Sequence, residues 1–132
     1  MIFKLWKQLS YINIDDDFEI IGVINNEILC IQKQSNLLFI DLKYFEIIFI
    51  KEIEEGFNHI KIVDNYLLQF YGKENKLKIK KDFFNLKHRQ FEKEELLERN
   101  INVSYLTEIL STDKGYLVIS NFEELFIFKL WY

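Results

Sequence analysis

The sequence predicts an all-β domain built of about three repeated antiparallel sheet units. The strongest sign is a self-match of the chain at an offset of 39 residues. A looser third copy of the pattern runs from Ile109 to Phe128. A period near forty residues, made of short apolar runs and polar turns, is typical of β-propeller blades and related sheet repeats. The match pairs Ile21 with Ile60, Val23 with Ile62, Asn25-Asn26 with Asp64-Asn65, Leu38 with Leu77 and Ile40 with Ile79, and we expect the apolar pairs to occupy equivalent buried sites.

Composition and apolar spacing support the same fold class. Nearly half of the 132 residues are hydrophobic, and most of these are Ile, Leu, Phe and Tyr, whose branched or aromatic side chains favour strands. Alanine, the best helix former, is absent, and so is proline. Polar breaks fall every eight to twelve residues, which is the spacing of an all-β fold. We therefore predict one domain over residues 1–132, without a second core.

The expected strands follow one another with tight turns between them. The apolar runs lie at residues 2–6, 18–24, 27–33, 36–42, 45–51, 58–63, 66–71, 76–81, 103–110, 115–120 and 124–131. Asn25-Asn26, Asp64-Asn65 and residues 113–115 are hairpin turns by residue type, so neighbouring strands are expected to be antiparallel. Residues 92–100 are charged around Leu96-Leu97 and form either a short helix or a charged loop.

The number of units limits the architecture. Three units are fewer than the usual four to eight blades of a propeller, so a propeller-like ring, a prism-like arrangement or a curled barrel fits better. The pentapeptide at residues 2–6 recurs at 127–131. Either this echo is a coincidence of composition, or the two segments pair and close the repeat.

No catalytic or metal-binding set stands out in the sequence. His59 and His88 are the only histidines, and neither has a second His or a Cys at ligand spacing. Cys30, the single cysteine, lies in an apolar run and is expected to be buried and inert. Phosphate loops, nucleophile elbows and paired cysteines are missing too. We therefore expect no enzyme, no catalytic residue, no metal and no cofactor.

Basic residues gather in one segment, residues 73–89, which we call the basic stripe. It holds seven basic and two acidic residues, a net charge of +5; because the whole chain carries −4, the remainder carries −9. Lys76, Lys78 and Lys80 alternate with Leu77 and Ile79, so the lysines should share a solvent face while the apolar pair points inward. Such lysines protect an exposed strand edge. Nucleic-acid contact is the weaker interpretation, because RNA-binding sheets expose aromatic rings and this strand has none.

Three acidic clusters are the candidate partner-binding surface. They are Asp15, Asp16 and Asp17; Glu52, Glu54 and Glu55; and Glu92, Glu94 and Glu95, with Phe57 and Phe91 as neighbouring aromatic anchors. Clustered carboxylates beside aromatic rings suit a basic partner, because complementary potential speeds encounter and aromatic side chains supply affinity. The plainer interpretation is that each cluster is a solvated loop that keeps an apolar chain in solution.

In size, acidic charge and lack of catalytic motifs, the chain resembles the immunity proteins that accompany bacterial contact-dependent and other polymorphic toxins. The resemblance implies a cytoplasmic bacterial protein that binds a cognate toxin domain, a basic nuclease, and blocks entry of its substrate. No apolar run approaches the roughly 18 residues needed to cross a bilayer, so we expect no membrane, and a nucleic-acid partner is the weaker interpretation. Two alternatives remain open: a nucleic-acid-binding module that uses the basic stripe, and a small β-repeat scaffold that binds peptides.

Overall fold

The computed structural model of this chain consists of strands and turns, as predicted. It describes residues 8–14, 17–57, 59–73, 76–99, 108–112, 114–120 and 124–129, and these contain eleven strands and no helix. The strands form three antiparallel sheets, which we call the first, middle and third sheets. The first sheet is β1 (Glu19–Ile24), β2 (Ile28–Lys33), β3 (Asn36–Asp41) and β4 (Glu46–Glu52); the middle is β5 (His59–Val63), β6 (Tyr66–Lys73), β7 (Lys76–Asn85) and β8 (Gln90–Arg99); the third is β9 (Glu108–Ser111), β10 (Tyr116–Ser120) and β11 (Leu125–Lys129).

The turns use residues that tolerate a left-handed backbone. Asn25 and Asn26 between β1 and β2 have φ of 45° and 61°, and Asp64 between β5 and β6 has φ of 52°. Asn and Asp adopt this region more readily than other residues with a Cβ, because their short polar side chains bond locally. The two hairpins predicted from these residues are therefore confirmed.

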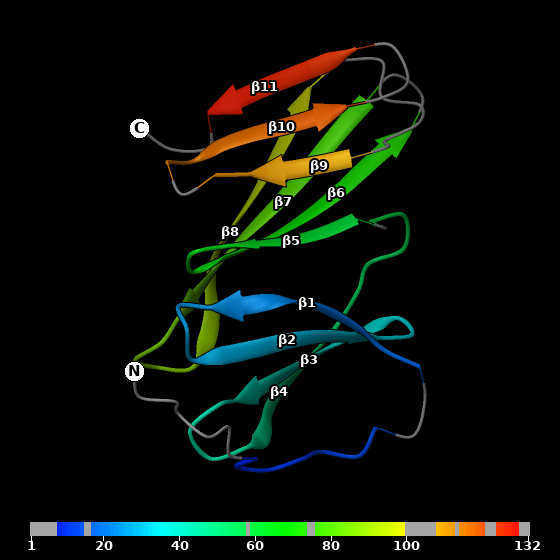
Figure 1. Cartoon of the computed structure of the whole chain (residues 1–132). Helices are drawn as coiled ribbons and strands as arrows, with labels where there is room; N and C mark the ends of the chain where they lie inside the picture. The colour runs from blue at the N-terminus through cyan, green and yellow to red at the C-terminus, as the bar shows by residue number, and fades with distance from the viewer. Residues whose placement is uncertain are drawn as a thin grey trace, which may run out of the picture.

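Each sheet is a simple meander in sequence order, and its first strand lies at an edge. Figure 1 shows β1, β5 and β9 one above another, with the first sheet continuing below β1 and the third above β9. A Cβ built on Gly22 of β1 would lie 3.5 Å from Ile62 of β5, so the two edge strands pack closely. The sheets thus spread from a common line of first strands, as propeller blades do, and none of the described sheets closes into a barrel.

Two cores fill the spaces between the sheets, where the chain length had suggested a single one, because the middle sheet packs against a neighbour on each face. The core between the first and middle sheets contains Ile24, Ile28, Cys30, Leu37, Phe39, Ile60, Leu67 and Phe84. The core between the middle and third sheets contains Val63, Leu68, Phe70, Leu77, Ile79, Ile109, Leu117 and Ile119. The middle sheet is therefore covered on both faces, which explains the continuous apolar run in β6. Fully burying a large apolar side chain contributes about 1.5–3 kcal/mol, so these cores are the main source of stability.

A bulge lets β8 serve both cores. Strand β7 pairs regularly with β6 and simply alternates, so Ile79 packs on the third-sheet side and Phe84 on the first-sheet side. The pairing of β7 with β8 shifts between Lys81 and Phe83, where β8 contains one residue more than β7. The extra residue exchanges the faces of β8, so Phe91 packs against the core on the first-sheet side and Leu97 against the core on the third-sheet side.

The predicted repeat is confirmed at the level of strands, but not at every side chain. Ile40, Ile60 and Ile79 are buried, whereas Val23 is 40% exposed because it lies after a bulge in β1 and faces away from the middle sheet. The second hairpins of the two units correspond at an offset of 40, since Lys33 pairs with Asn36 and Lys73 pairs with Lys76. One residue of difference exchanges the faces of a strand. Leu38 therefore lies on the outer face of the first sheet, whereas Leu77 lies in the core between the middle and third sheets.

Two other expectations are corrected. Residues 92–99 belong to β8 and are neither a helix nor a loop, because this segment pairs along the whole outer side of β7. The strand that carries Lys76, Lys78 and Lys80 is not an edge, because β7 lies between β6 and β8. The inward orientation of Leu77 and Ile79 is confirmed. The echo between the two ends falls largely outside the described residues.

Candidate functional site

The loop between β4 and β5 folds over the middle sheet and forms one wall of a pocket. The Ile53 amide donates a hydrogen bond to the Ser35 carbonyl at 2.8 Å, which ties the loop to the first sheet. Gly56 has φ of 93°, and a Cβ at this position would lie 2.4 Å from the Tyr71 ring of β6. Only glycine satisfies both the backbone conformation and the close approach. The Phe57 ring centroid lies 5.6 Å from that of Tyr71, so the loop is held against β6 by ring contact.

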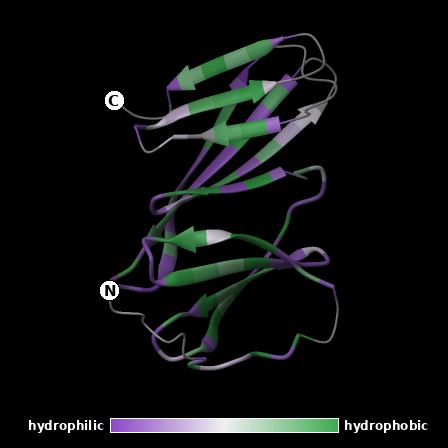
Figure 2. Cartoon of the chain, in the orientation of Figure 1, coloured by the Kyte–Doolittle hydropathy of each residue, from purple (hydrophilic) through white to green (hydrophobic). Residues whose placement is uncertain are grey.

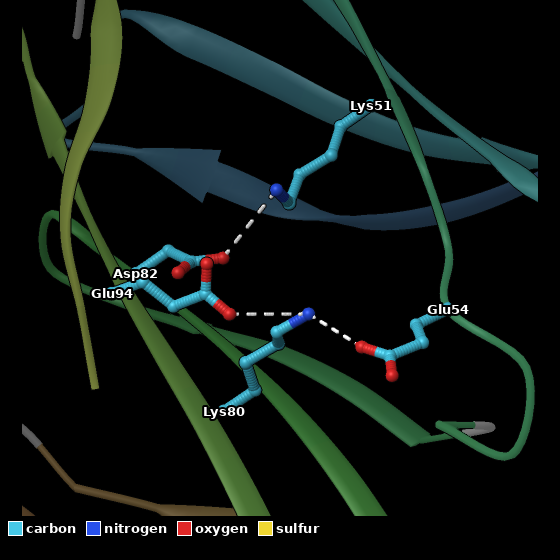
Figure 3. Close-up of polar contacts among 5 residues, drawn as sticks. All are labelled: Lys51, Glu54, Lys80, Asp82 and Glu94. Atoms are coloured by element: carbon cyan, nitrogen blue, oxygen red, sulfur yellow. Dashed lines mark hydrogen bonds and ion pairs between the residues drawn. The ribbon is translucent and has the colours of Figure 1, made fainter. Parts of the chain in front are cut away.

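Lys80 joins two of the predicted acidic clusters. Its Nζ donates to Glu54 Oε2 at 2.6 Å and lies 3.2 Å from Glu94 Oε1 (Figure 3). The lysine side chain is only 17% exposed. The hydrogen bond to Lys80 lowers the pKa of Glu54, and the same bond raises the pKa of Lys80 against the opposing effect of burial. Glu54 comes from the β4–β5 loop and Glu94 from β8, so clusters that are 40 residues apart meet on one cation.

We call the hollow around this contact the acidic pocket. Its volume is about 290 Å³. Three carboxylates, two ammonium groups, two aromatic rings and one exposed leucine line it. These residues are Glu54, Glu55, Glu94, Lys78, Lys80, Phe57, Tyr71 and Leu96. Three carboxylates against two ammonium groups leave the lining of the pocket with a net charge of −1.

A second ion pair lies behind the pocket and links two sheets. Lys51 Nζ of β4 lies 3.7 Å from Asp82 Oδ2 of β7, too far for a hydrogen bond but close enough for an ion pair (Figure 3). The Asp82 side chain is buried, and Oδ2 has no hydrogen-bond partner in the described part of the chain. Burial raises the pKa of Asp82 because it penalises the charged form, and Lys51 offsets part of this effect.

The floor beside Lys80 contains a buried amide. Gln69 of β6 stands opposite Lys80 in the sheet register, so both side chains share the face that looks toward the first sheet. Gln69 is almost completely buried, and neither its Nε2 nor its Oε1 has a hydrogen bond among the described residues. An unpaired buried amide lowers the free energy of unfolding, because its polar atoms lose their hydrogen bonds to water when they are buried. Polar groups therefore concentrate where the middle sheet faces the first sheet.

The structure separates the predicted site residues into three groups. Glu54, Glu55, Phe57 and Glu94 meet at the acidic pocket. Asp17, Glu52 and Glu95 are exposed and do not line it, and Asp15 and Asp16 lie outside the described residues. Glu92 accepts hydrogen bonds from Asn85 Nδ2 at 3.0 Å and Gln90 Nε2 at 3.2 Å, so it belongs to the β7–β8 turn region.

The two expected aromatic anchors are largely covered. Phe57 is buried beneath the loop, and Phe91 is half-buried. The Phe91 ring lies 5.0 to 5.7 Å from the rings of Phe39, Phe49 and Phe84. Edge-to-face contacts at this range stabilise a core. Sequence reasoning missed Tyr71, Lys78, Lys80 and Leu96 as pocket residues; the only available signal was the alternation of β7, which puts Lys78 and Lys80 on one face.

Part of the basic stripe is occupied by structural contacts. Arg89 Nη1 donates to the buried Asp41 Oδ2, which lies in β3 of the first sheet. Asp41 Oδ1 also accepts from the Lys43 amide at 2.6 Å and the Tyr44 amide at 3.1 Å. The bond from Arg89 lowers the pKa of Asp41, so this carboxylate stays charged in acid. Arg89 and Lys80 thus both hold the first sheet or its loop against the middle sheet.

The described residues include no group of three or more His, Cys, Asp or Glu side chains that could hold a metal ion. Burial raises the pKa of the Cys30 thiol to about 12, so it stays protonated. Since the described part of the chain has no helix, it also has none that could span a membrane.

Comparisons with protein-family models, with curated proteins and with solved structures found no match.

Proposed function

We propose that this chain is an interaction protein that binds a basic partner at the acidic pocket, and that it acts as an immunity protein toward a toxin domain. One observation carries the proposal: two acidic clusters that are distant in sequence converge on one hollow of about 290 Å³. Acidic clusters that only kept the chain in solution would not have to lie together. Partner-binding pockets combine rings, exposed apolar surface and charge in this way.

The pocket suits a lysine or arginine side chain of the partner. Glu55 supplies a carboxylate that is exposed at the rim. The Tyr71 ring forms an aromatic wall, and Lys78 Nζ lies over it at 5.4 Å from the ring centroid. Leu96 is 57% exposed and offers an apolar contact on the opposite wall. Acidic potential around the pocket speeds the encounter with a basic surface, while the rings and Leu96 contribute affinity after contact.

Inhibition then follows from occupancy. A nuclease places basic residues around its active site because its substrate carries phosphate charge. A protein that binds these residues covers the site and repels the substrate through its own carboxylates. This mechanism is stoichiometric and requires no catalytic group in the inhibitor.

The decisive experiment reads the gene immediately upstream and, if it encodes a toxin-like domain, measures binding to that domain; an upstream gene without such a domain speaks against the immunity role. Calorimetry on the parent and on Glu55→Lys should show at least a tenfold loss of affinity for the variant, because the reversed charge meets the partner's cation. Glu95→Lys is the matched control: it lies on β8, is exposed and does not line the pocket. If Glu55→Lys binds the domain and protects cells as the parent does, occlusion through this pocket is wrong.

Peptide binding is a second candidate, and a groove along the first strands favours it. The groove has a volume of about 370 Å³ and lies where the edges of β1, β5 and β9 approach one another. Glu19, Lys61 and Glu108 give it charges of both signs, and His59 also lines it. A peptide that binds here would shift the backbone amide NMR signals of β5 and leave those around Leu96 unchanged. A peptide array with no sequence that produces such shifts would contradict this candidate.

A further inference from the structure

The third sheet leaves one apolar face uncovered in the described part of the chain. Leu117 and Ile119 point into the core with the middle sheet, so their neighbours in the strands point the other way. On that outer face Val118 stands between Leu110 and Ile127 in a row across three strands. Ile127 is 68% exposed. Figure 2 shows β10 and β11 coloured mainly as hydrophobic along their length, although one face meets no other described sheet.

The first sheet has a corresponding apolar face at the opposite end of the fold. Its outer side chains come from all four strands and are mainly aliphatic, with a polar row of Lys33, Asn36 and Glu52 at one end. The register places on this face Ile20, Val23, Leu29, Ile31, Leu38, Ile40, Ile47 and Ile50. Ile14 of the N-terminal segment packs against its centre, and an apolar groove of about 220 Å³ remains beside this segment. Ile50 is 59% exposed.

The two end faces match the surfaces that already pack together inside the chain. Each internal contact joins an aliphatic sheet face to the sheet of the next unit, and the two cores consist of the same residue types as the end faces. End repeats of stacked folds usually carry a polar outer face. On the first sheet, Ile31, Leu38 and Ile40 are buried in a cluster with Ile14, and the apolar residues around this cluster are exposed. The exposed apolar residues at both ends are therefore interaction surfaces.

We propose that a second copy of this chain continues the stack, with the outer face of its first sheet docked on the outer face of the third sheet. The argument is continuity: the missing neighbour of the third sheet is another sheet of this repeat. The contact joins two different surfaces, so it is head-to-tail. Two copies that make it twice bring together six sheets, which lies within the four to eight blades of closed propellers.

The test measures the molar mass of the protein in solution, by light scattering coupled to size-exclusion chromatography. The 16.1 kDa chain should elute as a pair of twice that mass. Ile127→Asp blocks the third-sheet face and Ile50→Asp the first-sheet face; each variant alone should be monomeric. Because both positions are exposed, circular dichroism should confirm that the variants remain folded. Leu96→Asp, at a similarly exposed position on β8, is the control and should keep the mass of the pair.

Mixing the two blocked variants separates the possible geometries. Ile127→Asp keeps an intact first-sheet face and Ile50→Asp an intact third-sheet face, so an equimolar mixture should recover one contact and form a heterodimer. A parent that stays monomeric overturns the proposal. So does a dimer that Ile127→Asp abolishes while Ile50→Asp leaves intact, because that contact would be face to face. Assemblies that grow beyond two copies with concentration would overturn the closed pair.

Discussion

The two cores of the molecule differ in kind. The core between the middle and third sheets has an aliphatic centre in which, within the described chain, Phe70 is the one buried aromatic residue, while Tyr66, Phe126 and Phe128 pack against its margin. The core between the first and middle sheets contains the stacked and edge-on rings of Phe39, Phe84 and Phe91, and the buried polar residues Gln69 and Asp82 lie on the middle-sheet face that borders it. The first kind serves stability alone. The core between the first and middle sheets is less stable than an all-apolar core would be, because it borders buried polar groups next to a pocket. Binding sites commonly have this property.

The largest effect should come from removing the centre of the aromatic core. Phe39 is fully buried and contacts three other rings. Phe39→Ala should lower the free energy of unfolding by about 3–5 kcal/mol, because it removes apolar burial and leaves a cavity. Urea denaturation measures this loss. Leu77→Ala in the aliphatic core should cost about 2–5 kcal/mol; if only Leu77→Ala destabilises, the first sheet contributes little to the cooperative unit.

Replacing the buried amide should stabilise the protein. Gln69→Met keeps the length of the side chain and removes two polar atoms that have no partner in the described chain. Leaving such groups unpaired costs about 1–3 kcal/mol, so the variant should unfold at higher urea concentration. Gln8→Met, at an exposed position before β1, is a control that should change little. A Gln69→Met variant that is less stable than the parent would mean that the amide is paired in solution.

Asp82 should make stability depend on pH in an unusual direction. Burial raises the folded-state pKa of Asp82, so the folded chain holds this proton more tightly than the unfolded chain. Its contribution to stability is present in acid and is lost as pH rises from the unfolded-state pKa through the raised folded-state pKa. Asp82→Asn removes this dependence. The difference in unfolding free energy between variant and parent should therefore grow in favour of the variant across that interval; a flat difference would contradict the assignment.

The smallest effects belong to the lysines of β7. Lys80 pairs with two carboxylates and is mostly buried, whereas Lys76 pairs with Glu98 at 3.6 Å and is half-exposed. Lys80→Gln should cost about 1 kcal/mol and Lys76→Gln less than about 0.5 kcal/mol, because solvent screens exposed pairs. Thermal unfolding in low and high salt measures both. Equal losses for the two variants would show that Lys80 does not hold the loop over the middle sheet.

Local rules account for the strands, the turns and the repeat. Side-chain alternation and turn residues act between near neighbours, so Asn25, Asp64 and the inward pair Leu77 and Ile79 could be predicted from the sequence. The burial of Cys30 followed from its apolar run in the same way. Residues 92–99 could not be assigned to a strand, because their charged pattern becomes a strand only when β7 offers a partner for pairing.

The sequence by itself determined an all-β chain of repeated antiparallel units, since periodicity and turn chemistry are properties of short segments. Only the tertiary structure decided which face each side chain takes and which clusters meet. A bulge in β1 turned Val23 outward, a bulge in β8 placed Phe91 and Leu97 against different cores, and a one-residue difference in offset separated Leu38 from Leu77. Glu54 and Glu94 come together because sheets pack by their faces, and the pattern along one strand carries no information about the sheet that covers it.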